Sequence, residues 1–136
     1  MQVQPYLNFN GRAEEAINFY TQTIGAKVGA LMRCKDAPEG PPITPEMEDK
    51  IMHADFTVGE STLLVSDGYC TGSAPSFQGI TLTLTAADDA EARRLFDALL
   101  SDGGQVQMPL DKTFFASSFG MLADRFGVGW MVIAAG

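Results

Sequence analysis

Only two segments of this chain space their apolar residues three and four apart, as an amphipathic helix requires. In the first segment this stripe consists of Ala13, Ala16, Ile17, Tyr20 and Ile24. Gly25 follows at once and predicts the end of a helix of about 13 residues.

The second helical segment has a clearer start. Asp88 stands three residues before Glu91, which resembles a capping box, and Gly103-Gly104 predicts the end of the helix. The apolar stripe between them consists of Ala92, Leu95, Phe96, Leu99 and Leu100.

The rest of the chain has the patterns of β-strands, because β-branched and apolar residues run between turn residues. The expected strands are residues 3–9, 27–35, 51–58, 62–67, 80–85, 105–110, 114–123 and 129–134. The order of elements is therefore strand, helix and three strands, twice over.

These two halves resemble each other as sequences. A shift of 76 residues places Glu15 on Glu91 and Tyr20 on Phe96. After the helices the shift falls to about 67, because the proline-rich residues 36–45 form an inserted loop. We therefore predict an α+β fold of two tandem βαβββ modules, residues 1–68 and 78–136, joined by residues 69–77 in a single domain.

Composition excludes several classes of partner. Seventeen acidic residues against nine basic ones give a net charge of −8, so the chain has no basic face for nucleic acid or an anionic membrane. No apolar stretch reaches the ~20 residues that span a bilayer. Two cysteines, Cys34 and Cys70, and the absence of a secretory segment predict a cytoplasmic protein.

Alternation places polar side chains on the second face of three strands, opposite the face that packs on the helices. On the helix side we expect apolar residues such as Leu7, Phe56 and Ile80. On the other face the pattern places Gln4, Tyr6, Asn8, His53, Asp55, Thr57, Thr81, Thr83 and Thr85. Three strands with polar second faces predict sheets that curve around a cleft.

Four stretches of the chain resemble a known family. They are Pro5-Tyr6-Leu7-Asn8-Phe9-Asn10-Gly11-Arg12-Ala13-Glu14-Glu15-Ala16-Ile17-Asn18-Phe19-Tyr20, Ile51-Met52-His53-Ala54-Asp55, Ser66-Asp67 and Asp124-Arg125-Phe126-Gly127-Val128-Gly129-Trp130. Together they are similar to the PhnB-like branch of the glyoxalase/bleomycin-resistance/dioxygenase (vicinal oxygen chelate) superfamily. The resemblance implies two βαβββ modules that form a U-shaped mixed sheet around a cavity, usually within a homodimer.

The resemblance also implies where a metal would bind. In the metal enzymes of that superfamily the ligands are His, Glu or Gln side chains on the first, fourth, fifth and eighth strands. These positions fall near Gln4, within residues 64–66, on Gly79 and on Met131, and only the first could supply such a ligand. His53 is the only histidine, so a two-histidine site is excluded as well. We therefore expect neither a metal nor a cofactor.

A methyltransferase of the common type is not predicted either. It would need a strand, a glycine-rich turn and a helix to hold its donor, and the sequence has no such fingerprint. Cys70 stands in a loop where a thiol could react, but no second histidine is present to activate it.

Two interpretations stay open for His53 with Asp55, and two stay open for Arg33. His53 and Asp55 share a strand face and could act as base and orienter, or His53 could simply make a structural hydrogen bond across the sheet. Arg33 could bind an anionic ligand through its fork of donors, or form a surface ion pair.

Aromatic and thioether side chains are the remaining candidates. Tyr6, Asn8 and Phe119 could line a pocket for a flat organic molecule, with Thr81 and Thr83 beside them. Trp130 could join them, although alternation sends it with Val132 to the core. Three of the seven methionines could form an adaptable lining or fill the core: Met108, Met121 and Met131.

Three functions are consistent with these residues. We favour metal-independent binding of a small organic molecule in the cavity. The first alternative is an enzyme of the same fold, either metal-free with His53 and Asp55 as acid and base, or metal-dependent with isomerase or dioxygenase chemistry. The second is a dimeric interaction protein with a vestigial cleft.

Overall fold

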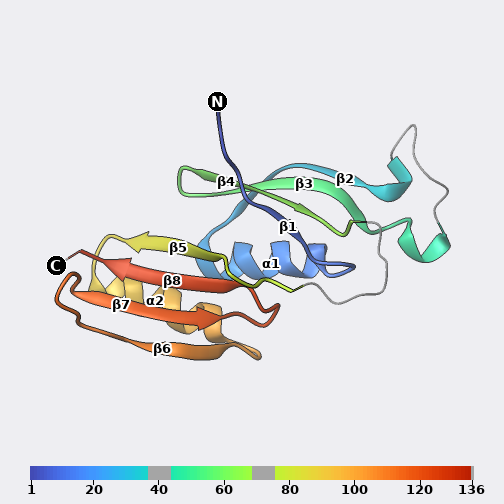
Figure 1. The fold of residues 1–136 in the computed structure, drawn as a ribbon. Coiled ribbons are helices and arrows are strands. Elements are labelled where there is room, and N and C mark those ends of the chain that lie inside the picture. Colours follow the sequence, from blue (N-terminus) through green and yellow to red (C-terminus); the bar gives the residue numbers. More distant parts are fainter. Residues whose placement is uncertain (37–43, 69–75, 136) are drawn as a thin grey trace. The chain divides into compact units, whose positions relative to one another are not determined.

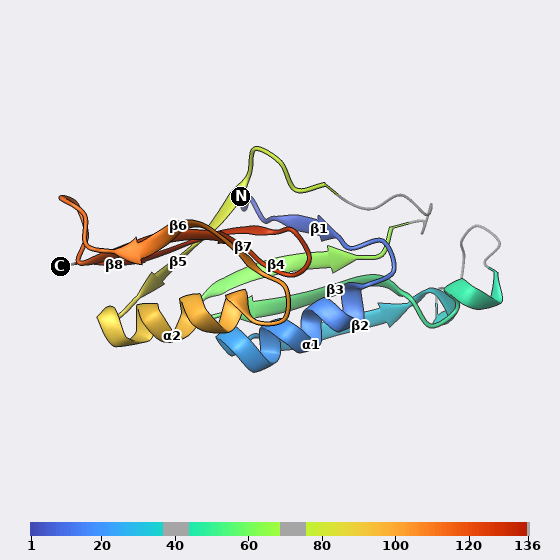
Figure 2. The same ribbon diagram turned by 90° about the horizontal axis from the view of Figure 1, so that it is seen from below.

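The chain forms two compact units, Met1–Pro75 and Ser76–Gly136, in a computed structural model that describes residues 1–36, 44–68 and 76–135 (Figure 1). Each unit contains one four-stranded sheet and one α-helix that runs beside it (Figure 2). The U-shaped arrangement around a cavity and the single domain stay predictions.

The first unit contains β1 (Tyr6–Asn8), α1 (Ala13–Ile24), β2 (Lys27–Arg33), β3 (Ile51–Val58) and β4 (Ser61–Ser66). Two short 3₁₀ helices, η1 (Cys34–Asp36) and η2 (Pro45–Met47), lie between β2 and β3. The strand order is β1-β4-β3-β2, with β1 parallel to β4 and the other pairs antiparallel.

The second unit contains β5 (Thr81–Ala86), α2 (Asp89–Leu100), β6 (Gln105–Asp111), β7 (Ser118–Ala123) and β8 (Gly129–Ala134). Its strand order is β5-β8-β7-β6, with β5 parallel to β8 and the other pairs antiparallel. Element order and strand order are therefore the same in both units, which confirms the duplicated βαβββ module.

The apolar stripes of both helices are buried as the spacing predicts, except that Leu100 at the end of α2 is half-buried. In the first unit Tyr20 is fully buried and stacks on Phe56, with the two ring centroids 5.8 Å apart. Gly25 ends α1 in the left-handed conformation, and its N–H bonds to a carbonyl of the last turn, on Tyr20. Asp88 caps α2 by accepting a 2.8 Å hydrogen bond from the N–H of Glu91.

In the second unit, β7 and α2 pack closely because Gly120 lacks a side chain. A Cβ atom at Gly120 would lie 2.7 Å from Cε2 of Phe96 and 2.9 Å from Cα of Leu110. Trp130 and Val132 are buried on this same side of the sheet, which confirms their assignment to the core and excludes Trp130 from an open pocket.

Some strand ends differ from those expected. The first strand begins at Tyr6 rather than at residue 3, and β2 gives way to η1 at Cys34. Phe114 and Phe115 do not belong to β7, because Thr113 forms a turn there and its hydroxyl accepts from the N–H of Ala116 at 3.1 Å. Ile80 precedes β5 and is exposed, so its assignment to the core was wrong.

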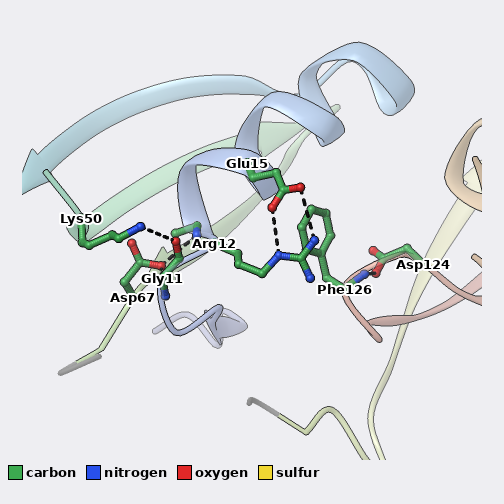
Figure 3. A network of polar contacts seen from close by, with 8 residues as sticks. Gly11, Arg12, Glu15, Lys50, Asp67, Asp124 and Phe126 are labelled. Carbon is green, nitrogen blue, oxygen red and sulfur yellow. Dashed lines mark hydrogen bonds and ion pairs between the residues drawn. The ribbon is translucent and has the colours of Figure 1, made fainter. Parts of the chain in front are cut away.

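One buried carboxylate joins three parts of the first unit. Asp67, only 1% exposed, accepts hydrogen bonds at Oδ1 from the N–H groups of Gly11 (2.7 Å) and Ala13 (2.8 Å). Its Oδ2 accepts from the N–H of Ile51 at 2.8 Å. Figure 3 shows Asp67 beneath the turn that leads into α1, where Lys50 Nζ also donates to the carbonyl oxygen of Gly11 at 3.0 Å. Asp67 therefore satisfies N–H groups at the start of α1 and of β3.

A second buried carboxylate shapes the turn between β7 and β8. Oδ1 of Asp124 accepts from the N–H groups of Phe126 (2.9 Å) and Val128 (3.1 Å), and the first of these bonds is drawn in Figure 3. Oδ2 accepts from Nε1 of Trp130 at 2.9 Å. The residues from Asp124 to Trp130 thus form one hydrogen-bonded unit.

We predict that replacing Asp67 with Ala lowers the free energy of unfolding by about 2–4 kcal/mol, because buried N–H groups lose a charged acceptor. Urea unfolding followed by circular dichroism measures the change. Asp97→Asn is the matched control, because the Asp97 carboxylate is exposed and forms a surface ion pair with Arg93 on the same helix. Equal unfolding midpoints for Asp67→Ala and the control would contradict this role.

Candidate functional site

Four polar candidates of the first unit, Tyr6, Asn8, His53 and Asp55, lie on the sheet face opposite α1, whereas Arg33 bonds to Glu14 of α1. Strand pairing places Tyr6, Leu64 and Asp55 in one row, because Leu64 on β4 is the partner of both others. Leu7 and Phe56 point to the other face and are buried, as alternation predicts. We call the surface that carries Tyr6, Asn8, His53 and Asp55 the open face of the first unit.

Tyr6 and His53 meet on this open face. The Tyr6 hydroxyl lies 3.3 Å from Nδ1 of His53, and the two ring centroids are 5.8 Å apart. The direction of this hydrogen bond follows the tautomer of the imidazole. Tyr6 belongs to β1 and His53 to β3, so the pair reaches across the intervening strand β4. Tyr6 is 54% exposed, which leaves much of its ring accessible to a ligand.

Asp55 is engaged with a β-bulge in the neighbouring strand. The register of β2 against β3 shifts between Val28 and Leu31, so Gly29 and Ala30 together lie opposite Asp55. Oδ1 of Asp55 accepts from the N–H of Ala30 at 3.3 Å. The same oxygen fills the space that a Cβ atom at Gly29 would need. His53 and Asp55 therefore share a face but have different hydrogen-bond partners.

Asn8 helps to form the turn after β1. Its Oδ1 accepts from the N–H of Asn10 at 2.9 Å, and its Nδ2 lies 2.6 Å from where a Cβ atom of Gly68 would be. Beside it, the Ser66 hydroxyl donates to the carbonyl oxygen of Met52 at 2.7 Å. Asn8 is exposed, so its side chain borders the open face as well.

Arg33 forms an ion pair, as one of the two interpretations of this residue predicts. Its guanidinium bonds to the Glu14 carboxylate and donates to the carbonyl oxygen of Asp49 at 2.7 Å. The hydrogen bond that Arg33 donates to the Glu14 carboxylate raises the pKa of Arg33. An anionic ligand at Arg33 would have to compete with Glu14 for the guanidinium.

The remaining candidates belong to the second unit. Thr81 and Thr83 are exposed on β5, on the face that alternation predicts. Phe119 is 8% exposed because Phe115 packs on it edge to face, with the ring centroids 5.1 Å apart. Phe119 is therefore covered, whereas Phe114 is exposed.

The positions that the superfamily uses for a metal do not fit a hard divalent cation. Gln4 is exposed ahead of β1, and the Ser66 hydroxyl is used by the Met52 carbonyl oxygen and the Gly68 N–H. Gly79 has no side chain, and Met131 offers only a thioether. Within residues 1–36, 44–68 and 76–135, no three His, Cys, Asp or Glu side chains gather into a possible metal site.

Of the two cysteines, the structure describes Cys34. Cys34 is buried, and burial raises the pKa of its thiol, with the charge of Asp67 adding to the effect. Cys70 lies outside the described residues.

Two features of this site could not be predicted from the sequence alone. The bulge that Asp55 fills depends on the pairing of β2 with β3, although Gly29 inside a strand pattern is a weak indication of a bulge. The contact between Tyr6 and His53 depends on the parallel pairing of β1 with β4. Both are consequences of strand order rather than of local composition.

The chain is similar in sequence and structure to several known proteins. The family described as 3-demethylubiquinone-9 3-methyltransferase matches residues 1–133. Protein YjdN of Escherichia coli is 34% identical over 140 aligned positions, which cover 97% of this chain and 94% of YjdN. The crystal structure of protein PA1353 from Pseudomonas aeruginosa is 44% identical, with a TM-score of 0.86 over 99% of this chain and 98% of that one.

A further structure, described as a putative 3-demethylubiquinone-9 3-methyltransferase, PhnB protein, from Bacillus cereus, is 29% identical, with a TM-score of 0.81 over 99% of this chain and 100% of that one. A glyoxylase/bleomycin resistance protein/dioxygenase domain from Frankia, 13% identical with a TM-score of 0.72, shares the fold. The structural alignment covers 98% of the Frankia chain and 100% of this one. Among the described residues, none of the helices has the length and apolarity to cross a membrane.

We predict that Gly29→Ala and Asp55→Ala disturb the same local contact. Either change removes the carboxylate from the N–H of Ala30, so hydrogen exchange at that amide is expected to accelerate about fivefold to tenfold. Amide exchange measured by NMR tests this, with Thr57→Ala on the same strand face as the control. An unchanged Ala30 exchange rate in both variants would show that Asp55 does not hold the bulge.

Proposed function

We propose a binding function for this chain, which belongs to the PhnB-like 3-demethylubiquinone-9 3-methyltransferase family. The proposal is that a small organic molecule binds on the open face of the first unit, against Tyr6 and His53. The observation that carries it is the 3.3 Å contact between the Tyr6 hydroxyl and Nδ1 of His53, beside a tyrosine ring that is 54% exposed.

This pair offers a ligand two kinds of contact. The exposed face of Tyr6 can stack on a flat ring, and the hydroxyl and imidazole can exchange hydrogen bonds with its polar groups. Because the Tyr6 hydroxyl lies at Nδ1, Nε2 is the imidazole nitrogen that can still bond to a ligand. Asn8 and Thr57 provide further polar groups along the same face.

Charge favours a neutral or cationic ligand. The chain carries a net charge of −8, and Arg33, on the edge strand of this sheet, already pairs with Glu14. An aromatic compound without a negative charge is therefore the ligand class that fits this face. A phosphonate or another multiply charged anion would lack an available guanidinium here.

We do not extend methyl transfer to this chain from the family description. A donor held between a strand and a following helix lies against the helix N-terminus and its N–H groups. Between β1 and α1 those groups already bond to Asp67, at 2.7 Å for Gly11 and 2.8 Å for Ala13. No reaction step is assigned to a divalent metal either, because the side chains at the ligand positions of the superfamily do not fit a hard cation.

Acid–base catalysis by His53 is the second candidate function. A histidine that acts as a general base needs a hydrogen-bond partner that fixes the orientation of its ring, and the Tyr6 hydroxyl at Nδ1 can be that partner. Asp55, by contrast, bonds to the backbone of β2. If the protein is an enzyme, Tyr6 therefore orients the base more directly than Asp55 does.

Self-association completes the proposal. We propose a homodimer in the cytoplasm, as the family resemblance implies. Sedimentation velocity of the purified chain tests the dimer independently of any ligand, and a monomer at micromolar concentration would contradict it.

We predict that Tyr6→Phe weakens binding by about tenfold, because the ring stays and one hydrogen bond is lost. The probes are planar aromatic compounds in matched neutral, cationic and anionic series, detected by ligand-observed NMR. His53→Gln is expected to weaken the same compounds, and the neutral and cationic series are expected to bind more tightly than the anionic one.

The control is Thr85→Val, an exposed polar residue on a strand of the second unit. It is expected to leave the dissociation constants unchanged. Binding that survives both Tyr6→Phe and His53→Gln without loss would place the ligand elsewhere and overturn the proposal.

A further inference from the structure

Three methionines lie side by side across the sheet of the second unit. Met108 on β6 is paired with Met121 on β7, and Met121 is paired with Met131 on β8. Thr83 on β5 is the next partner in this line, and its hydroxyl contacts Sδ of Met131 at 3.8 Å. We call Met108, Met121 and Met131 the methionine row.

A bulge in β6 puts Met108 into this row. Gln105 pairs with Ala123 and Val106 with Leu122, and this register would place residue 107 opposite Met121. The register shifts between Val106 and Met108, so a methionine stands there instead. Because neighbouring residues of a strand point to opposite faces, the bulge turns Met108 to the face that Met121 and Met131 share.

The methionine row does not fill the core of its unit. The core against α2 is formed by Leu122, Trp130 and Val132, which are the strand neighbours of the row and are almost completely buried. Met108 is 44% exposed, and Met121 and Met131 are half-buried. The three thioethers therefore lie on the sheet face away from α2, and core filling does not explain them.

We propose that the methionine row binds a soft monovalent metal ion of the Cu⁺ or Ag⁺ type through its three thioether sulfurs. Soft sulfur donors select such ions over hard divalent cations. Neighbouring strands are about 4.8 Å apart, and three flexible torsions let the outer side chains lean toward the middle one. A neutral thioether loses no proton on binding, and the net charge of −8 attracts a cation.

The test uses Ag⁺ alone as the probe, because it is redox-inert and has the same soft character. The chain is labelled with ¹³C at the methionine methyl groups, and silver nitrate is added up to four equivalents in a chloride-free buffer. We expect the methyl signals of Met108, Met121 and Met131 to shift together, and the other four of the seven methionines to stay in place. Silver bound to Cys34 or Cys70 does not produce this pattern.

Two variants make the test specific. Met121→Leu removes the central sulfur with little change in volume and is expected to weaken silver binding at the row at least tenfold. Met52→Leu, in the first unit, is the matched control and is expected to change nothing at the row. Fluorescence of Trp130, the only tryptophan, reports whether each variant keeps the packing of the second unit.

Either of two results would overturn the site. The methyl signals of the row could stay fixed through four equivalents of silver, or they could shift equally in a well-folded Met121→Leu variant. If the planar aromatic compounds used for the first unit move these signals and silver does not, the row is an apolar contact surface and the metal proposal is wrong.

Discussion

The carboxylate of Asp67 is the contact on which the candidate binding face depends. It stands at the end of β4 and bonds to the turn after β1 on one side and to the first residue of β3 on the other. Tyr6 comes from β1 and His53 from β3, so the strands that carry this pair are joined through one buried charge. A buried carboxylate is tolerated there because three backbone N–H groups replace its water.

The two units have the same architecture, but their sheets carry different side chains on the face away from the helix. Strand order is the same in both units, yet the face away from the helix carries Tyr6, His53 and Asp55 in one unit. In the other it carries threonines and three methionines. Bulges contribute to both surfaces: one in β2 is filled by Asp55, and one in β6 turns Met108 outward. The shared fold therefore determines how the strands and helices are arranged, whereas the chemistry of each face depends on its bulges and side chains.

Local patterns were sufficient to predict the two helices, the repeated order of elements and the face on which Tyr6, His53 and Thr83 lie. These features depend on the spacing of apolar and polar residues within one segment, and this spacing can be read directly from the sequence. The bulges, the contact of Tyr6 with His53 and the bonds of Asp67 depend on which strands pair and in what register, and no single segment contains that information. Phe114 and Phe115 have the apolar pattern of a strand, but the hydrogen bond from the N–H of Ala116 to the Thr113 hydroxyl forms a turn there instead.

Binding of a ligand at His53 beside Tyr6 can be observed in the ¹⁵N spectrum of the imidazole, recorded with and without a bound aromatic compound. His53 is the only histidine, so both ring-nitrogen signals belong to this residue, and their couplings to the ring protons tell Nδ1 from Nε2. We expect both nitrogen signals to shift in proportion to the bound fraction, with Nε2 moving more. A compound that binds the protein and leaves both nitrogen signals unchanged would contradict this expectation.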